Sequence, residues 1–218
     1  MSQLIICGAG EIAELAHFYF TKEEKLKVAA FTVDDEYVKE KQFCGLPVVP
    51  FSEVAKKFPA TNHKGFVAIS YNQMNRVRER KFNDFTDLKY DLVSYISPKC
   101  TNYAASIGKN CFIFEDNTLQ PFSKIGNNVT LWSGNHIGHH SVIEDHCFIT
   151  SHVVVSGGVT VRHNAFLGVN VTLRDHIEIG AYALVGAGAV IVDNIPERSV
   201  SIGTKAKITD KDSWDVKI

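Results

Sequence analysis

The chain has 218 residues, enough for one large domain or two small ones, with 45% hydrophobic and 22% charged residues as in ordinary globular proteins. Its net charge of -1 gives no electrostatic basis for binding nucleic acid or an anionic membrane. No apolar run approaches the roughly 18 residues of a membrane span, and no signal peptide is evident. The five cysteines are never spaced as CxxC, so we expect reduced thiols in a cytoplasmic protein.

Residues 4–20, LIICGAGEIAELAHFYF, predict a buried strand, a glycine turn and a helix. Gly8, Gly10 and Ala13 place GxGxxA at that junction, where backbone N–H groups and the helix dipole can hold a phosphate. A second strand, KVAAFTV, ends in Asp34 and Asp35, and acidic residues at that distance can bond a ribose or a base. The rest of this region predicts parallel strands at 45–49 and 65–70 and helices around 52–58 and 74–87. We therefore expect a small Rossmann-like α/β domain with a parallel sheet over residues 1–98.

The glycine pattern alone leaves its purpose open. A full dinucleotide fold needs two βαβ halves and only one fits before Pro98, which disfavours an NAD-dependent dehydrogenase. Glycines at such a junction can equally serve only to let the helix pack closely on the strand.

Beyond Pro98 every sixth residue is aliphatic, without exception, from Ile107 to Ile191. The residue four places later is usually small or β-branched, and glycine often follows the aliphatic residue directly. A strict period of six fits neither a helix nor an ordinary strand, and it is the signature of a parallel β-helix. Three hexads close one triangular coil, so residues 18 apart stack on one another and the aliphatic residues fill the interior.

Three stretches, IGHHSVIEDHCFI, VSGGVTV and IEIGAYALVGAGAVIVDNIPERSVSIGTKAKI, resemble the hexapeptide-repeat acyltransferases. The most similar branch includes the bacillosamine-pathway N-acetyltransferases and the sialic acid O-acetyltransferases. The resemblance covers nearly the whole chain. It implies a left-handed β-helix, which we place at residues 99–204 with a C-terminal tail at 205–218, and a homotrimer with active sites between neighbouring subunits.

The resemblance also implies substrates. In the bacillosamine-type enzymes the N-terminal domain binds the nucleotide of a nucleotide-linked amino sugar, and Gly8, Gly10, Asp34 and Asp35 match the residues that do so. The acetyl donor is acetyl-CoA. Glu11 stands in the glycine turn, where a carboxylate would face a phosphate, so it either points away or contacts a sugar amine.

Residues 135–152 hold five of the nine histidines. His140, His146 and His152 each follow an aliphatic residue of the six-residue series by three places, so they occupy equivalent places around one coil and cannot converge within one subunit. The γ-class carbonic anhydrases, which share the β-helix, bind zinc between subunits through an H-x4-H pair, and no two histidines here have that spacing. Trimer symmetry could still assemble three histidines, but the spacing counts against it and we expect no metal.

His139 occupies the position of the family's catalytic base, which takes a proton from the attacking group. His140 follows it where the family usually has Asp or Glu. Either another carboxylate, such as Glu144 or Asp145 from this or a neighbouring subunit, supplies the compensating charge, or the base works without one. Gly157, one coil beyond His139, matches the glycine whose N–H meets the acetyl carbonyl.

Coenzyme A is expected to pass Val169 and Ala187, with its phosphates near Lys205 and Lys207. Asn135 is either a contact for the acceptor sugar or an ordinary turn residue. The sequence thus predicts direct acetyl transfer from acetyl-CoA to the amine of a nucleotide-linked amino sugar. O-acetylation of a free sugar acid and a non-catalytic β-helix subunit remain alternatives.

Overall fold

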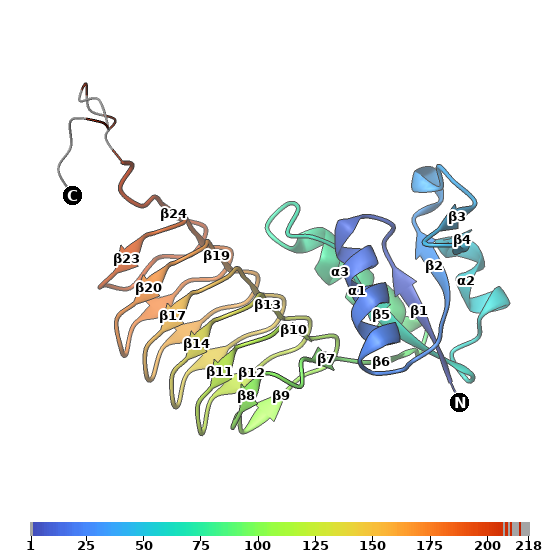
Figure 1. Cartoon of the computed structure of the whole chain (residues 1–218), viewed down its shortest axis with the longest axis horizontal. Coiled ribbons are helices and arrows are strands. Elements are labelled where there is room, and N and C mark those ends of the chain that lie inside the picture. The colour runs from blue at the N-terminus through green and yellow to red at the C-terminus, as the bar shows by residue number, and fades with distance from the viewer. Residues whose placement is uncertain (1, 207, 209, 211–213, 215–218) are drawn as a thin grey trace.

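The computed structural model describes residues 2–206, 208, 210 and 214. It consists of an α/β domain followed by a prism of stacked short strands, which confirms the predicted fold class (Figure 1). None of the helices described is long and apolar enough to cross a membrane.

The N-terminal domain is a six-stranded sheet with helices on both faces. Leu4 and Ile6 of β1 face the cluster that includes α1, whereas Ile5 and Cys7 face the cluster that includes α2 and α3. The central strands of the sheet are buried on alternate sides in this way because helices cover both faces. The strand order is β3-β4-β2-β1-β5-β6, and all pairs are parallel except the short edge pair β3–β4. The bounds are β1 (Gln3–Cys7), α1 (Glu11–Lys22), β2 (Val28–Val33), η1 (Asp35–Tyr37), β3 (Gln42–Phe43), β4 (Leu46–Pro50), α2 (Phe51–Lys57), β5 (His63–Val67), α3 (Arg76–Asp87) and β6 (Asp91–Leu92).

The second domain is a β-helix of two-residue strands that form three parallel sheets, one on each face of the prism. We name each face by its first strand. The β7 face holds β7 (Tyr95–Ile96), β10 (Phe112–Ile113), β13 (Thr130–Leu131), β16 (Phe148–Ile149), β19 (Phe166–Leu167), β22 (Leu184–Val185) and β24 (Val200–Ser201). The β8 face holds β8 (Thr101–Asn102), β11 (Thr118–Leu119), β14 (His136–Ile137), β17 (Val154–Val155), β20 (Thr172–Leu173) and β23 (Val190–Ile191). The β9 face holds β9 (Ser106–Ile107), β12 (Lys124–Ile125), β15 (Val142–Ile143), β18 (Thr160–Val161) and β21 (Glu178–Ile179).

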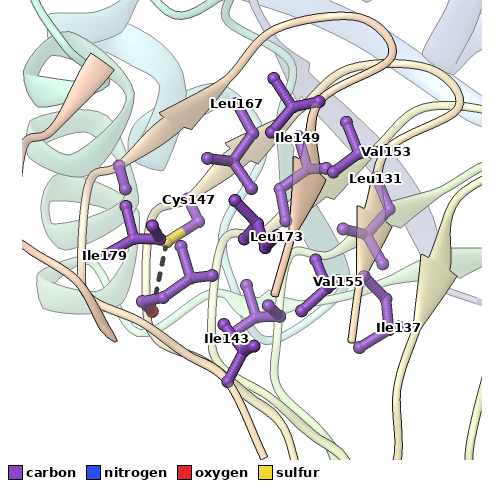
Figure 2. Close-up of a cluster of buried hydrophobic side chains, with 14 of the residues drawn as sticks. Leu131, Ile137, Ile143, Cys147, Ile149, Val153, Val155, Leu167, Leu173 and Ile179 are labelled. Atoms are coloured by element: carbon purple, nitrogen blue, oxygen red, sulfur yellow. Dashed lines mark hydrogen bonds between the residues drawn. The ribbon is translucent and has the colours of Figure 1, made fainter. Parts of the chain in front are cut away.

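The interior of the prism is the aliphatic series read from the sequence. Ile113, Leu131 and Ile149 are neighbours in adjacent coils, each fully buried, and the other two faces repeat this arrangement. Figure 2 shows Leu131 and Ile149 pointing into the same interior as Ile137, Ile143 and Cys147. Burial raises the pKa of the Cys147 thiol to about 12, so this cysteine is a core residue without nucleophilic character, as the sequence indicated. The first coil already includes β7, a few residues before the boundary that we placed at residue 98.

The corners of the prism explain the spacing of the histidines. Each corner is a four-residue turn, and its third residue repeatedly has a left-handed backbone, with φ of 59° at His140, 64° at His146, 58° at His152 and 55° at His176. Non-glycine residues rarely adopt this conformation, and Asn, Asp and His are enriched among those that do. The six-residue spacing of these histidines therefore reflects a backbone requirement of the turn, and the three in one coil stand at three different corners.

One corner is also where the α/β domain docks. Arg78 of α3 is 2% exposed, and its guanidinium donates hydrogen bonds to the backbone oxygens of Asn128, His146 (2.8 Å) and Cys147 (3.2 Å). Asn75 accepts a further hydrogen bond from Arg78 at 3.0 Å. Burial lowers the pKa of Arg78 to about 10, and no carboxylate among the described residues pairs with it. The domains are therefore joined by a buried cation that is stabilised by backbone oxygens.

Candidate active site

His139 lies in the corner between the β8 and β9 faces, which we call the β8/β9 corner. It follows β14 and Gly138, where a Cβ would lie 2.6 Å from the Ser156 carbonyl carbon, so only glycine lets the coils approach this closely. The His139 N–H donates to Gln120 Oε1 at 2.9 Å, and its carbonyl accepts from the Gly158 N–H at 2.9 Å. The backbone of His139 is thus fixed by the coils before and after it, while its side chain is exposed.

Gly157 lies directly against the His139 ring. A Cβ placed on Gly157 would lie 2.6 Å from His139 Cε1 and 2.7 Å from Nε2, well inside van der Waals contact. Among the residues that the structure describes, none accepts a hydrogen bond from the Gly157 N–H. A basic nitrogen and a free backbone donor therefore stand side by side, which is the arrangement that acyl transfer needs for proton removal and for the oxyanion.

His140 contacts His139 through its ring. The two Nδ1 atoms are 3.1 Å apart, and the rings meet edge to face with centroids 5.3 Å apart. The His140 ring also lies over Phe122, at a centroid distance of 4.7 Å.

The two carboxylates considered as partners for the base are occupied elsewhere in the same chain. Glu144 accepts hydrogen bonds from the Arg162 guanidinium at 2.7 Å and from the His163 N–H at 3.0 Å. Asp145 accepts from the Asn127 N–H at 2.7 Å. Both belong to the next corner of the coil, so within one chain neither carboxylate reaches His139.

A cleft of about 720 Å³ separates the glycine turn of the α/β domain from the corner between the β7 and β8 faces, the β7/β8 corner. Gly8 and Gly10 line one side. The other side is formed by a loop after β5 and by the β-helix, through Ala68, Ile69, Ser70, Tyr71, Trp132, Phe148, Thr150, Ser151 and Val169. The cleft lies where β1 and β5 end, at the switch point of the sheet, which is the usual ligand site of open α/β sheets.

The two glycines of the turn differ in what they require. Gly8 has a φ of 126°, and a Cβ there would lie 2.4 Å from the Ala68 carbonyl oxygen, so only glycine fits. Gly10 is the N-cap of α1, with an extended backbone and open space around it. Close packing thus explains Gly8. At Gly10, by contrast, the missing side chain leaves space in the cleft.

The paired acids at the end of β2 are engaged by the chain itself. Asp34 forms ion pairs with Arg80, at 2.8 Å, and with Lys81. Asp35 accepts hydrogen bonds from the Ser52 hydroxyl at 2.6 Å and from the Ser52 N–H at 3.1 Å, and these bonds lower the pKa of its carboxyl. Both acids therefore hold helices α2 and α3 at the carboxyl end of the sheet, and neither lines the cleft.

The remaining predicted residues divide between two groups. Val169 lines the cleft, and exposed Ala187 follows one coil further along the β7/β8 corner, with exposed Lys205 beyond it. Lys207 lies outside the described residues. Asn135 is 1% exposed, and its Oδ1 accepts from the Val153 N–H at 2.8 Å, so it braces adjacent coils and we leave it out of the sugar site.

The sequence reading did not find Tyr71, Trp132 or Phe148 as cleft residues, nor Gln120 as the partner of His139. Trp132 directly follows Leu131 of the aliphatic series, so its half-buried ring lies outside the prism, and this position was a signal for an aromatic side chain there. Tyr71 comes from the other domain and no spacing rule connects the two. Among the described residues no group of histidine, cysteine or acidic side chains could hold a metal ion.

Two family models match the β-helix. Residues 122–157 match the bacterial transferase hexapeptide (six repeats), and residues 141–175 match the hexapeptide repeat of succinyl-transferase. Among curated proteins, the chain is 32% identical over 130 residues to the bifunctional protein GlmU of Thermotoga maritima. It is 26% identical over 109 residues to the acyl-[acyl-carrier-protein]–UDP-N-acetylglucosamine O-acyltransferase of Nautilia profundicola. These matches cover 51% and 47% of this chain but only 29% and 42% of the relatives.

Solved structures match over nearly the whole length. PerB from Caulobacter crescentus, in complex with CoA and GDP-perosamine, has a TM-score of 0.83 at 26% identity, with 96% of this chain and 98% of that chain covered. A mutant of perosamine N-acetyltransferase from the same organism, in which a histidine is replaced by asparagine, gives the same TM-score at 25% identity and covers 97% and 98%.

The stacked hexads and the corner histidine define a hexapeptide-repeat β-helix protein of the transferase type. The β-helix carries the hexapeptide repeat of bacterial transferases over residues 122–157, and nearly the whole chain is similar in structure to solved sugar N-acetyltransferases.

Proposed function

We propose that the protein transfers the acetyl group of acetyl-CoA to the amine of a nucleotide-linked amino sugar. The observation that carries this proposal is the similarity, over both domains, to a structure with CoA and GDP-perosamine bound. The His139–Gly157 pair and the cleft beside the glycine turn are the two features of this chain that such a reaction would use.

In the proposed reaction the neutral sugar amine attacks the thioester carbonyl carbon while His139 Nε2 takes the proton that the amine loses. The carbonyl oxygen becomes an oxyanion and accepts a hydrogen bond from the Gly157 N–H. When the intermediate collapses, the C–S bond breaks and the proton on His139 passes to the leaving thiolate of coenzyme A. The base returns to its neutral state, and no acyl-enzyme is needed.

The site is completed by a second copy of the chain in this proposal. His139 stands at the β8/β9 corner, whereas the cleft and Val169 stand at the β7/β8 corner, and the whole β8 face separates the two corners within one prism. A neighbour that packs alongside would place its own corner next to His139, as in the trimer that the family resemblance implies. Coenzyme A would then lie between two prisms, along Val169 and Ala187 of one of them.

The nucleotide would lie in the cleft, with its phosphates at the N-terminus of α1. The lining residues include no lysine or arginine, so backbone N–H groups would have to hold the phosphates. Aromatic side chains at Tyr71 and Trp132 offer flat surfaces for a base or a sugar ring. Because Asp34 and Asp35 already have partners, we assign them the role of holding the helices around the cleft.

Thermal stabilisation by nucleotides tests the acceptor class. UDP, GDP, dTDP and CMP are added separately to the full chain, and at least one is expected to raise the melting temperature in proportion to its affinity. The same nucleotide should give no increase with Gly10→Trp, which fills the open wall of the cleft. If none of the four changes the melting temperature, the nucleotide-linked acceptor is wrong. A free sugar acid acetylated on oxygen then becomes the better candidate, because Asp34 and Asp35, the acids expected to contact a nucleotide, already have partners within the chain.

A further inference from the structure

The two neighbouring histidines of the β8/β9 corner meet through the same ring atom. Nδ1 of His139 and Nδ1 of His140 are 3.1 Å apart, within hydrogen-bond distance. Two imidazole nitrogens can form such a bond only when one carries a hydrogen and the other a lone pair. The pair must therefore share one hydrogen between the two Nδ1 atoms, and the tautomers of the two rings are linked.

Both rings are held by the chain in positions that favour this contact. His140 has a φ of 59°, and its ring packs on Phe122 of the preceding coil at 4.7 Å, with 33° between the planes. His139 is held by Gly157 beneath its ring and by the bond from its N–H to Gln120. The contact is thus built from three adjacent coils and does not depend on a bound substrate.

No acidic side chain in the part of the chain that the structure describes competes for these ring nitrogens. Among the described residues, no carboxylate oxygen lies within 4.0 Å of a ring nitrogen of either histidine. The nearest titratable and charged groups further along the same corner are two coils on, at Arg174, Asp175 and His176, and Asp175 lies 3.9 Å from His176. The corner of the preceding coil, residues 120–123, has no titratable side chain. His136 on the β8 face and Lys124 on the β9 face are the strand residues with titratable side chains in these two coils that flank the corner.

We infer that His140 is a positioning residue whose neutral imidazole does for His139 what a carboxylate does in other histidine-based sites. Its Nδ1 lone pair accepts the hydrogen bond from His139 Nδ1–H, which places the lone pair of His139 on Nε2, beside the Gly157 N–H. When the acceptor gives its proton to His139 Nε2, the imidazolium keeps its bond to His140, and the charge-assisted bond is stronger than the neutral one. The inference rests on the proposed function, because it assigns His139 as the base.

A histidine partner has a consequence that a carboxylate partner does not. The pair takes up its first proton as a unit, because the proton can be shared across the Nδ1 contact. A second proton brings two like charges together and replaces the lone pair of His140 with an N–H, so the contact is lost. The Nδ1 contact therefore holds only while the pair carries no more than one added proton.

Nuclear magnetic resonance of the full-length protein with nitrogen-15-labelled histidine tests the tautomers directly. Resonances are assigned through His139→Asn, His140→Asn and His176→Asn, and asparagine suits the left-handed backbone of the two turn positions. At neutral to mildly basic pH we expect the Nδ1–H form at His139 and the Nε2–H form at His140. The Nε2–H form at His139 would overturn the inference. This readout does not require acetyl transfer, so it stands even if the proposed function fails.

Steady-state kinetics with an acceptor that the protein acetylates gives the second test. His140→Asn keeps an oxygen in place of Nδ1 and should retain kcat within about threefold, whereas His140→Gly removes the acceptor and should lower kcat about tenfold or more. The KM for acetyl-CoA should change little in either variant. His176→Asn, a matched change at the same turn position of the same corner but two coils away from the pair, should leave kcat unchanged. Equal kcat values for His140→Gly and His140→Asn would contradict a positioning role.

Discussion

Gly157→Ala is the substitution whose effect on the site can be worked out most directly. The added Cβ would lie 2.6 Å from His139 Cε1 and 2.7 Å from Nε2. Ordinary carbon contacts begin at about 3.5 Å, so the ring must retreat by about 1 Å. Misplacement of a catalytic group by about 1 Å can cost about 100-fold, and we expect a loss of that size in kcat.

The fold should tolerate this change. The φ of Gly157 lies outside the left-handed region, and the atoms in the way belong to an exposed side chain that can turn toward solvent. The free energy of unfolding should therefore change by less than about 1 kcal/mol.

Thioester release from acetyl-CoA, followed with the accepted sugar, measures the loss, and urea denaturation checks the fold. The matched control is the same change in a His139→Asn protein, where no imidazole remains to be displaced and Gly157→Ala should cost almost nothing more. Activity of Gly157→Ala within a few-fold of the unchanged protein would refute the reasoning, because the ring and the glycine would then not be working in contact.

Other predictions concern the domain joint, the glycine turn, pH and assembly. Arg78→Met should lower the free energy of unfolding by about 3 kcal/mol in urea, since buried carbonyl oxygens lose their donor, while exposed Arg76→Met should change it little. Gly8→Ala should cost about 2 kcal/mol because its Cβ meets the Ala68 carbonyl oxygen, whereas Gly10→Ala should be nearly neutral. Burial lowers the pKa of His146 from its ordinary value of 6.5, so the unfolded chain binds the proton more readily than the folded chain. The free energy of unfolding should therefore fall as pH drops below 6.5. In urea titrations from about pH 7.5 to 5, His146→Asn should flatten that dependence. Mixed assemblies are refolded from equal amounts of inactive His139→Asn and inactive Gly10→Trp chains. If each site takes the base from one chain and the cleft from another, about a quarter of the sites combine two intact parts, and up to about a quarter of full activity should return. If both parts come from the same chain, no activity should return.

The β-helix could be predicted because its rule is local and repeated. Each aliphatic residue of the six-residue series packs on the residues 18 places away, so the period in the sequence is the period of the core. The contact between His139 and Gly157 follows from the same arithmetic, since the two residues are one coil apart. The histidine spacing also had a local cause, because the third residue of each turn has a left-handed backbone. Asparagine at the equivalent turn positions of other coils, Asn128 and Asn164, could have revealed this requirement from the sequence.

The cleft and the domain joint could not be predicted in this way, because they depend on how the two domains dock. Arg78 lies 68 residues from His146, and nothing in the intervening sequence indicates that its guanidinium enters a corner of the prism. Asp34 and Asp35 have the right sequence position for a ribose, but α3 and α2 supply Lys81 and Ser52, which occupy them first. The spacing of a motif predicts where an acidic residue lies along a strand, but it does not predict which side chains of other elements will bind that residue.

The central claim is that His139 removes the proton from an amino sugar as it attacks acetyl-CoA. The most direct measurement is thioester release across a panel of nucleotide-linked amino sugars, with the unchanged protein and His139→Asn compared side by side. We expect turnover of at least one acceptor and a loss of about 10²- to 10⁴-fold in kcat for His139→Asn, with acetyl-CoA binding retained. Release that persists within a few-fold in His139→Asn would contradict the assignment of the base, and no release with any amino sugar would contradict the acceptor class.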